Sequence, residues 1–351
     1  MRNIEFHNRE KETKEIRAIL DRQPTLITFI YGPINSGKTE LINHVIEELP
    51  EEYVVFYINL RTKFLAGYDD FIESLFEMEM ETEAALKKGK ETLAELVSSV
   101  TKVAGIPITR EFLDYVFKDN KPKNAFSYII KLFEEVKNSG KQPVLILDEL
   151  QKIGDVKVNG PLIYELFNFF IDLTKEKHLA HVFAMTSDSL FIEQIYSKAM
   201  LEERCRYLLV DDFDYETTAA FLEKYDFTDG ERVIAWKYCG GKPVCLVELV
   251  NAKINRKDVE KEAKKFLKIR TSQILSIFDE ISLGKVEYTE NALIQELKNF
   301  EKEEMMGYDR VNKEKIFLVG RNVLFIDPTQ RTIKPQSRLN LLAIREVISD
   351  A

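Results

Sequence analysis

The stretch LITFIYGPINSGKTE, residues 26–40, decides the fold of this chain. Its first six residues have the composition of a buried β-strand. Residues 32–39 match the pattern G-x-x-x-x-G-K-[ST], in which a glycine-containing loop directs backbone N–H groups toward phosphate. A helical pattern begins near Lys38, so the motif stands between a strand and a helix, as a phosphate site at a helix N-terminus requires. This context predicts a nucleotide site rather than an ordinary strand-to-helix turn.

The side chains of this loop have separate expected tasks. Lys38 is expected to reach the β and γ phosphates, and the Thr39 hydroxyl is expected to bind Mg²⁺. We therefore expect ATP with Mg²⁺ as the ligand, and ADP as the product of hydrolysis. The residues assigned to nucleotide binding in this stretch are Gly32, Pro33, Ile34, Asn35, Ser36, Gly37, Lys38, Thr39 and Glu40.

The composition is typical of a soluble protein with two or three domains. The chain has 351 residues, and 45% of them are hydrophobic, which is enough for more than one core. The net charge of −9 argues against a protein that coats nucleic acid over its whole surface. The charged N-terminus and the absence of a long apolar run predict a cytoplasmic location without a membrane segment. The three cysteines lack the spacing of a metal site or a disulfide framework, so we expect buried, reduced thiols.

Apolar runs alternate with helical patterns through about residue 210, which predicts an α/β domain with a parallel sheet covered on both faces. Short helices follow, and then a mixed segment that ends in two short strands. We expect a P-loop ATPase core at 1–210 with a helical insertion at about 62–142, a helical lid at 211–275 and a further domain at 276–351. The predicted strands of the sheet are Leu26–Tyr31, Tyr53–Asn59, Val144–Leu147, His181–Met185 and Tyr207–Val210.

The second chemical motif is VLILDE, residues 144–149. Its four apolar residues predict a buried strand that delivers Asp148 and Glu149 to the carboxyl end of the sheet, where parallel sheets bind ligands. Asp148 is expected to hold Mg²⁺ together with Thr39, and Glu149 to orient or deprotonate the water that attacks the γ-phosphate. Many strands end in solvated acids, but the phosphate loop upstream favours the catalytic interpretation.

Two further polar positions adjoin later strands. Ser187 follows the strand at 181–185 and would lie beside the γ-phosphate if that strand neighbours the strand of the phosphate loop; it could instead belong to a helix-capping cluster. Arg204 precedes the last strand, where an arginine can stabilise the charge of the transition state. It could equally form a surface ion pair, and it could act within its own chain or across a subunit boundary.

Together these motifs resemble the archaeal ATPase family, a branch of the STAND class of P-loop NTPases related to the AAA+ ATPases. The resemblance covers about residues 4–270. The opening FHNRE, residues 6–10, is similar to the F-x-x-R-E start of the family, which implies that Arg9 lies near the adenine. The segment GGKP, residues 240–243, is similar to the G-x-P lid signature, which implies that Gly241 and Pro243 close on the nucleotide. The same segment has the pattern of a glycine C-cap followed by a helix-starting proline.

The C-terminal part resembles the winged-helix domain of this family. Its expected pieces are helices near 291–302 and 309–319 and a hairpin made by 322–326 and 331–334. Residues 310–345 contain eight arginines and lysines against two acidic residues, a net charge of +6 in an acidic chain. This charge favours an anionic partner, with DNA as one candidate. The alternative is a domain that packs on the ATPase core or on a protein partner.

The sequence thus predicts an ATP-binding, slowly hydrolysing switch ATPase, in which ATP closes the lid and hydrolysis relaxes it. Its partner would be DNA, another protein or a second copy of the chain. The alternative function is that of a DNA-binding ATPase similar to archaeal replication initiators or loaders, which also combine a P-loop core, a lid and a winged helix. A scaffold with an inactive site is disfavoured because Lys38, Thr39, Asp148 and Glu149 are all present.

Overall fold

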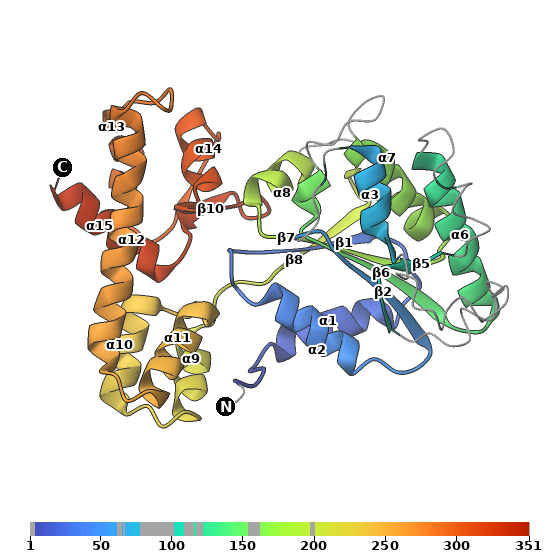
Figure 1. The fold of residues 1–351 in the computed structure, drawn as a ribbon, viewed down its shortest axis with the longest axis horizontal. Helices are drawn as coiled ribbons and strands as arrows, with labels where there is room; N and C mark the ends of the chain where they lie inside the picture. The colour runs from blue at the N-terminus through green and yellow to red at the C-terminus, as the bar shows by residue number, and fades with distance from the viewer. Residues whose placement is uncertain are drawn as a thin grey trace, which may run out of the picture.

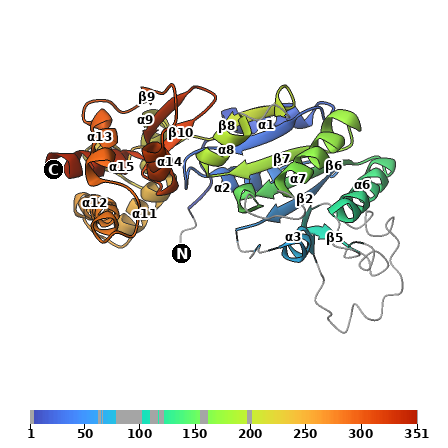
Figure 2. The same cartoon turned by 90° about the horizontal axis from the view of Figure 1, so that it is seen from above.

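The computed structural model describes residues 4–61, 65, 67–77, 102–108, 116, 122–153, 162–196 and 201–350. These residues form an α/β part built on a parallel sheet and a second, mainly helical part that includes the C-terminal helix (Figure 1). The two parts touch where β10 (Leu324–Asp327) packs against α8 (Ser189–Tyr196), an arrangement visible in Figures 1 and 2.

The sheet of the α/β part has six strands in the order β4-β2-β6-β7-β1-β8, and every pairing is parallel. Its central strands are apolar and buried along their length, as a parallel sheet covered on both faces requires. The strands are β1 (Ile27–Tyr31), β2 (Tyr53–Asn59), β4 (Lys102–Ala104), β6 (Gln142–Asp148), β7 (His181–Thr186) and β8 (Cys205–Leu209).

Helices cover both faces of this sheet (Figure 1). Alternate residues of a strand point to opposite faces, so the core divides into two apolar clusters. Phe29 belongs to the cluster under one layer of helices, whereas Ile30 belongs to the cluster under the other. The first layer contains α3 (Tyr68–Leu75), α6 (Pro122–Asn138) and α7 (Leu162–Ile171), and the second contains α1 (Glu10–Leu20) and α2 (Lys38–Glu47).

The strand order determines which residues meet at the carboxyl edge of the sheet. β1 lies between β7 and β8, and β6 is the next strand beyond β7. The phosphate loop after β1, the residues after β7 and the two acids at the end of β6 therefore share one edge. The condition set for Ser187, that its strand neighbours the strand of the phosphate loop, is met because Tyr31 pairs with Thr186.

Helices replace strands after β8, as the sequence predicted. The side chains of Asp214, Thr228 and Asp258 each accept a hydrogen bond from a backbone N–H in the first turn of the helix that follows, which fixes where these helices begin. The helices are α9 (Tyr215–Glu223), α10 (Asp229–Cys239), α11 (Pro243–Ile254) and α12 (Val259–Ser282).

The C-terminal residues form helices around a three-stranded antiparallel sheet in the order β10-β11-β9. The two predicted helices and the predicted hairpin are present within one or a few residues of their expected bounds. β9 and the long C-terminal helix were not predicted. The elements are α13 (Glu290–Leu297), β9 (Met306–Gly307), α14 (Lys313–Gly320), β10 (Leu324–Asp327), β11 (Thr332–Pro335) and α15 (Arg338–Asp350).

Helix α12 passes through the position where we expected the lid to end, residue 275. Its first half contributes Val259 and Ala263 to the apolar cluster that it shares with α9, α10 and α11. Its second half contributes Ile274 and Phe278 to the cluster of the C-terminal residues. One continuous helix is thus shared by two cores, and the change of core lies in the middle of the helix.

The predicted insertion at 62–142 is only partly helical where the structure describes it. Besides α3 and α6, it supplies the edge strand β4 and a short parallel pair, β3 (Phe76–Glu77) with β5 (Ile106–Pro107). Much of the predicted insertion lies outside the described residues. Within the described ranges, the structure has no helix with the length and hydropathy needed to span a bilayer.

Candidate nucleotide-binding site

The loop between β1 and α2 has a tightly curled backbone. Asn35 and Gly37 have positive φ angles of 58° and 91°, and Gly37 is the N-cap residue of α2. Gly32 has no room for a side chain, because a Cβ atom there would lie 2.1 Å from the carbonyl oxygen of Val210. The curl ends at the N-terminus of α2, where unpaired N–H groups and the helix dipole favour an anion. The loop therefore has the geometry of a phosphate cradle.

Lys38 is buried although it carries a charge, with 7% of its surface exposed. Its Nζ donates to the carbonyl oxygens of Gly32 at 3.0 Å and of Pro33 at 2.9 Å. Burial and, to a smaller extent, the nearby charge of Lys242 lower the pKa of Lys38 to about 8, against the opposing effect of Glu149. A phosphate at this position would supply the negative charge that the two carbonyls lack.

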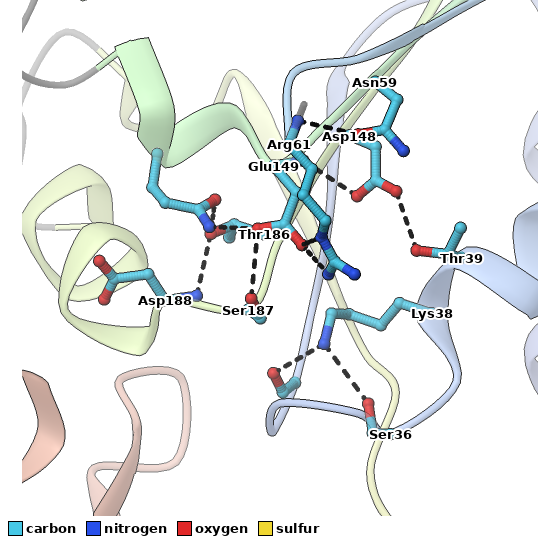
Figure 3. Close-up of polar contacts among 12 residues, drawn as sticks. Ser36, Lys38, Thr39, Asn59, Arg61, Asp148, Glu149, Thr186, Ser187 and Asp188 are labelled. Carbon is cyan, nitrogen blue, oxygen red and sulfur yellow. Dashed lines mark hydrogen bonds and ion pairs between the residues drawn. The ribbon is translucent and has the colours of Figure 1, made fainter. Parts of the chain in front are cut away.

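Thr39 and Asp148 meet between α2 and the end of β6 (Figure 3). Thr39 Oγ1 donates to Asp148 Oδ2 at 2.9 Å, and the Tyr57 hydroxyl donates to the same oxygen at 2.9 Å. The other carboxylate oxygen accepts from the backbone N–H of Glu149. A hydroxyl and a carboxylate beside a phosphate loop are the oxygen ligands that Mg²⁺ takes together with nucleotide phosphates. The residues present therefore fit a magnesium ion.

Glu149 follows β6 and has a positive φ of 61°. Its carboxylate forms an ion pair with Arg61, whose Nε lies 3.1 Å away, and it accepts from Gln151 and from Ser187 at 3.4 Å (Figure 3). Burial raises the pKa of this carboxyl, but the hydrogen bonds from Arg61 and Gln151 outweigh that effect and hold the pKa below its usual value. Glu149 is therefore ionised near neutral pH and is engaged by Arg61.

The polar residues after β7 include both alternatives that the sequence left open: a serine that reaches the site and a residue that caps the next helix. Ser187 Oγ donates to Glu149, so this serine reaches the site. Asp188 Oδ1 accepts from the backbone N–H groups of Leu190 and Phe191 at 2.9 and 3.2 Å, which is a cap for α8. The capping role belongs to Asp188, and Ser187 lies beside the acid. Its role as a sensor of the γ-phosphate stays a prediction.

Arg9 is buried and connects the phosphate loop to the segment after β8. Its Nη2 donates to the carbonyl oxygens of Ser36 at 2.6 Å and of Asp211 at 2.7 Å. The guanidinium lies 4.5 Å from the centre of the Phe213 ring. The backbone of Phe213 in turn packs so tightly on Gly241 that a Cβ there would lie 1.7 Å from a carbonyl oxygen. Contacts thus run in sequence from Ser36 to Arg9, from Arg9 to Phe213, and from Phe213 to Gly241.

The segment that begins α11 lies on the phosphate loop. Lys242 Nζ donates to the carbonyl oxygen of Ile34 at 3.0 Å and forms an ion pair with Asp212 at 2.8 Å. The Pro243 ring is close to Gly37, since a Cβ placed on Gly37 would lie 4.0 Å from Pro243 Cγ. The expected lid residues are therefore adjacent to the loop. Their closure on a nucleotide stays a prediction.

One of the predicted residues lies away from this site. The carbonyl oxygen of Arg204 accepts from the N–H of Ile27, the first residue of β1, so Arg204 lies at the amino edge of the sheet. A strand rises about 3.3 Å per residue, which puts Arg204 roughly 15 Å from the phosphate loop and beyond the reach of its side chain. This corrects the expectation of a role for Arg204 in its own chain; a role in a neighbouring subunit stays a prediction. The side chain of Glu40, in the first turn of α2, is exposed, and its part in nucleotide binding stays a prediction.

Three residues of the site were not anticipated from the sequence: Tyr57, Arg61 and Lys242. A signal existed for the first two, because Tyr57 lies near the end of the strand at 53–59 and Arg61 follows it. The carboxyl end of this strand must lie near the end of β6 if the two strands pair. Lys242 stood inside the GGKP segment, but only the glycine and the proline were given a role. Lys242 is only 3% exposed because the chain folds it against the phosphate loop and Asp212, which are distant in sequence.

The parallel sheet with its phosphate loop at the carboxyl end of β1 defines a P-loop ATPase fold. The chain belongs to the family described as the ATPase domain predominantly from Archaea, whose model matches residues 6–249. A second model, described as the C-terminal domain of MJ1010-like uncharacterized ATP-binding proteins, matches residues 260–348. The resemblance to the archaeal ATPase family is thereby confirmed.

Relatives match over nearly the whole chain. An uncharacterized ATP-binding protein of Methanocaldococcus jannaschii is 46% identical, with 99% of this chain and 98% of the relative covered. One from Pyrococcus abyssi is 50% identical, with 98% of each covered. Among solved structures, the Walker-type ATPase PABY2304 of Pyrococcus abyssi has a TM-score of 0.66 at 16% identity and covers 97% of this chain and 96% of its own, which shows a shared fold.

Proposed function

We propose that this protein is an ATP-hydrolysing switch of the STAND type, in which the nucleotide lies between the phosphate loop and the start of α11. One observation carries the proposal: Lys38, Thr39, Asp148, Glu149 and the Lys242–Pro243 segment all converge on the same loop. We keep the division into a core at 1–210, a lid at 211–275 and a winged-helix domain at 276–351 as part of the proposal, with the last two joined by the continuous helix α12.

In the binding step, Lys38 would exchange the carbonyl oxygens of its own loop for phosphate oxygens. The exchange is favourable because carbonyl dipoles stabilise an ammonium less than phosphate charges do in a buried site. Thr39 and Asp148 would hold Mg²⁺, which would supply positive charge to neutralise the phosphates. Arg9 would act indirectly, by fixing the Ser36 carbonyl and with it the curl of the loop.

In the hydrolysis step, Glu149 would accept a proton from the attacking water. A general base must be ionised at the working pH, and the lowered pKa of Glu149 meets this requirement. Its carboxylate must also be free to contact water, whereas in the structure it is engaged by Arg61 and Ser187. Release of Glu149 from Arg61 would therefore precede catalysis, which supports slow turnover rather than rapid cycling.

The C-terminal hairpin would report the state of the nucleotide site. Lys334 on β11 forms an ion pair with Asp211, the residue whose carbonyl binds Arg9. The backbone N–H of Ile326 on β10 donates to Ser189 Oγ at 3.2 Å, beside the Ser187 segment. A γ-phosphate that moved the segments around 187 or 211 would change both contacts, so ATP and ADP would favour different positions of the hairpin.

The partner is better described as a protein or a second copy of the chain than as DNA. Many of the basic side chains at 310–345 are already engaged within the chain. Arg345 donates to the carbonyl oxygens of Phe300 and Lys302. Five others form ion pairs: Lys313 with Glu314, Lys315 with Glu296, Arg321 with Glu280, Lys334 with Asp211 and Arg338 with Glu304. The initiator or loader function remains the alternative, and these pairs weigh against it.

The deciding experiment compares Glu149→Gln with Glu165→Gln, a matched change at an exposed position of α7. Glu149→Gln keeps the shape of the side chain but removes the base, so ATP binding should persist while hydrolysis slows by roughly a hundredfold or more. Glu165→Gln should hydrolyse ATP like the parent. Calorimetry measures binding, and phosphate release measures turnover. Equal turnover in all three proteins would remove Glu149 from the mechanism, and a parent that neither binds nor hydrolyses ATP would refute the proposed function.

A further inference from the structure

A line of hydrogen bonds reaches Glu149 from the end of β7 through the side chain of Gln151. Gln151 lies in the short 3₁₀ helix Leu150–Ile153, directly after the two acids. Its NH₂ group donates to Glu149 Oε2, and its amide oxygen accepts from the Thr186 hydroxyl at 2.7 Å. The Thr186 oxygen in turn accepts from the backbone N–H of Asp188 at 3.0 Å (Figure 3). We propose that Gln151, oriented by Thr186, is a positioning residue that holds the Glu149 carboxylate for its work as the base, a role that rests on the proposed function.

The order of donors and acceptors determines which end of the Gln151 amide faces the acid. The Thr186 hydroxyl accepts from the N–H of Asp188, so its own proton is directed to its other neighbour, the amide oxygen of Gln151. The NH₂ group then faces Glu149, whose ionised carboxylate can only accept. All the bonds run in one direction, and in such a chain each bond polarises and strengthens the next. The network therefore assigns one orientation to the amide.

The far end of this line is anchored in packed elements. Thr186 is the last residue of β7 and pairs with Tyr31 of β1. It is only 1% exposed, which leaves almost no surface for a ligand, so its hydroxyl acts on the site through Gln151. Asp188 caps α8 with its side chain. The amide of Gln151 is thus held by the sheet and by the start of α8.

The two oxygens of the Glu149 carboxylate have different partners. Oε1 is engaged by Arg61, whose side chain is 60% exposed. Oε2 accepts from Gln151 and, at 3.4 Å, from Ser187. An ion pair to an exposed arginine is weak, so Arg61 can leave at little cost. Its departure would free Oε1 to take the proton of the attacking water, while Gln151 keeps Oε2 and with it the orientation of the carboxylate.

The first test removes each link of the line separately. Gln151→Ala removes the donor to Glu149, and Thr186→Val removes the orienting hydroxyl with little change of shape. Both should lower kcat for ATP by roughly tenfold to a hundredfold, the effect of a small misplacement of a reacting group. The Kd for MgATP, measured by calorimetry, should stay close to the parent's value. Thr186→Ser keeps the hydroxyl and should restore most of the rate, and Gln295→Ala, at an exposed position of α13, is the matched control.

A pH–rate profile separates positioning from a general loss of structure. Burial raises the pKa of Glu149, and the hydrogen bonds from Arg61 and Gln151 lower it. Gln151→Ala should therefore move the acidic limb of the profile to higher pH, and Thr186→Val should move it in the same direction. A variant that has merely lost part of its structure would lose rate and MgATP affinity together, without a shift of the limb, and that result would count against the proposal.

The last test is a double-mutant cycle with Glu149→Gln. Because Gln151 acts through Glu149, Gln151→Ala should slow the parent but should not slow Glu149→Gln any further. Turnover of Gln151→Ala equal to that of the parent, or a full additional loss in the Glu149→Gln protein, would overturn the proposal. The proposed function is judged separately. Glu149→Gln that hydrolyses ATP like the parent would remove the base itself, whereas a slow Glu149→Gln beside a fully active Gln151→Ala would remove only Gln151.

Discussion

The hydroxyl of Tyr31 donates a hydrogen bond to Asp327 Oδ1 at 2.8 Å and lies 3.0 Å from the hydroxyl of Thr329. Tyr31 is the last residue of β1 and directly precedes Gly32 of the phosphate loop, whereas Asp327 ends β10 in the C-terminal hairpin. Residues separated by almost 300 positions in the chain are thus joined at the base of the nucleotide site. This contact provides a direct route from the loop to the hairpin.

Tyr31→Phe should loosen the hairpin without disturbing the sheet. The change leaves the buried carboxylate of Asp327 with one donor fewer, at a cost of about 1–3 kcal/mol. Hydrogen–deuterium exchange of residues 324–335 should become faster, while exchange within β1 stays slow. Tyr53→Phe is the matched control, because the Tyr53 hydroxyl donates to the Leu20 carbonyl within the core. Equal exchange of the hairpin in both variants would mean that the Tyr31 contact does not hold it.

Lys38 should make ATP binding depend on pH near pH 8. The folded-state pKa of Lys38 is about 8 in the free protein, and phosphate contacts should raise it, so binding takes up about half a proton at pH 8. Affinity should fall as pH rises above 8. Calorimetry in buffers of different ionisation enthalpy measures the proton uptake. Lys38→Ala should lose both the affinity and the uptake, whereas Lys131→Ala, on the exposed side of α6, should keep both.

The same pKa makes an opposite prediction for the stability of the nucleotide-free protein. A lysine whose folded-state pKa is below its unfolded value of 10.5 leaves the unfolded chain with more bound protons between about pH 8 and pH 10.5. The contribution of Lys38 to the free energy of unfolding should therefore rise with pH in that window. Denaturant unfolding of the parent and of Lys38→Ala should show this difference in slope. Parallel pH profiles would contradict the burial of the ammonium.

Arg61→Ala should shift the acidic limb of the pH–rate profile to higher pH. Burial raises the pKa of Glu149, and the hydrogen bonds and charge of Arg61 are the main opposing effect. Without Arg61, Glu149 would stay protonated to a higher pH and the base would be lost earlier on acidification. Arg17→Ala, which breaks a surface ion pair with Glu48, is the control. An unshifted limb would mean that the Arg61 contact does not set the ionisation of Glu149.

The sequence alone was sufficient to predict the strands and the phosphate loop, because these features depend on neighbouring residues. Three of the five predicted strands, β1, β6 and β7, are apolar runs that are buried almost throughout, whereas β2 and β8 are partly buried. The phosphate loop is bounded by its own strand and helix. The order of the strands needed one further condition, that the strand before Ser187 pairs with β1, and the structure meets it. Because β6 is parallel to β7, the acids at its end must lie at the same edge of the sheet as the phosphate loop.

Contacts between residues far apart in the sequence could not be predicted from local sequence patterns. Arg61 and Glu149 are 88 positions apart, and Lys242 and Ile34 are 208 apart. The contact of Arg61 could be expected only once the strands that end near it and near Glu149 were known to pair, and no local pattern indicated the contact of Lys242. The prediction that Arg204 acts in the site of its own chain was wrong because of the direction of its strand. Arg204 does precede a strand, as predicted. However, β8 runs parallel to β1, so the start of β8 lies at the amino edge of the sheet, and the phosphate loop lies at the carboxyl edge.

The basic C-terminal segment should bind duplex DNA weakly, with a shallow dependence on salt. Each phosphate that a protein neutralises contributes about −0.9 to the slope of log K against log salt. Because five of the eight basic residues at 310–345 pair with acidic side chains and Arg345 donates to two carbonyl oxygens, we expect at most about two such contacts. Anisotropy titrations of a labelled duplex at several salt concentrations, with and without MgATP, measure the slope. A steep slope that flattens when Lys313, Lys315 and Arg331 are changed to alanine, while ATP affinity stays constant, would establish a nucleic-acid interface and favour the initiator alternative.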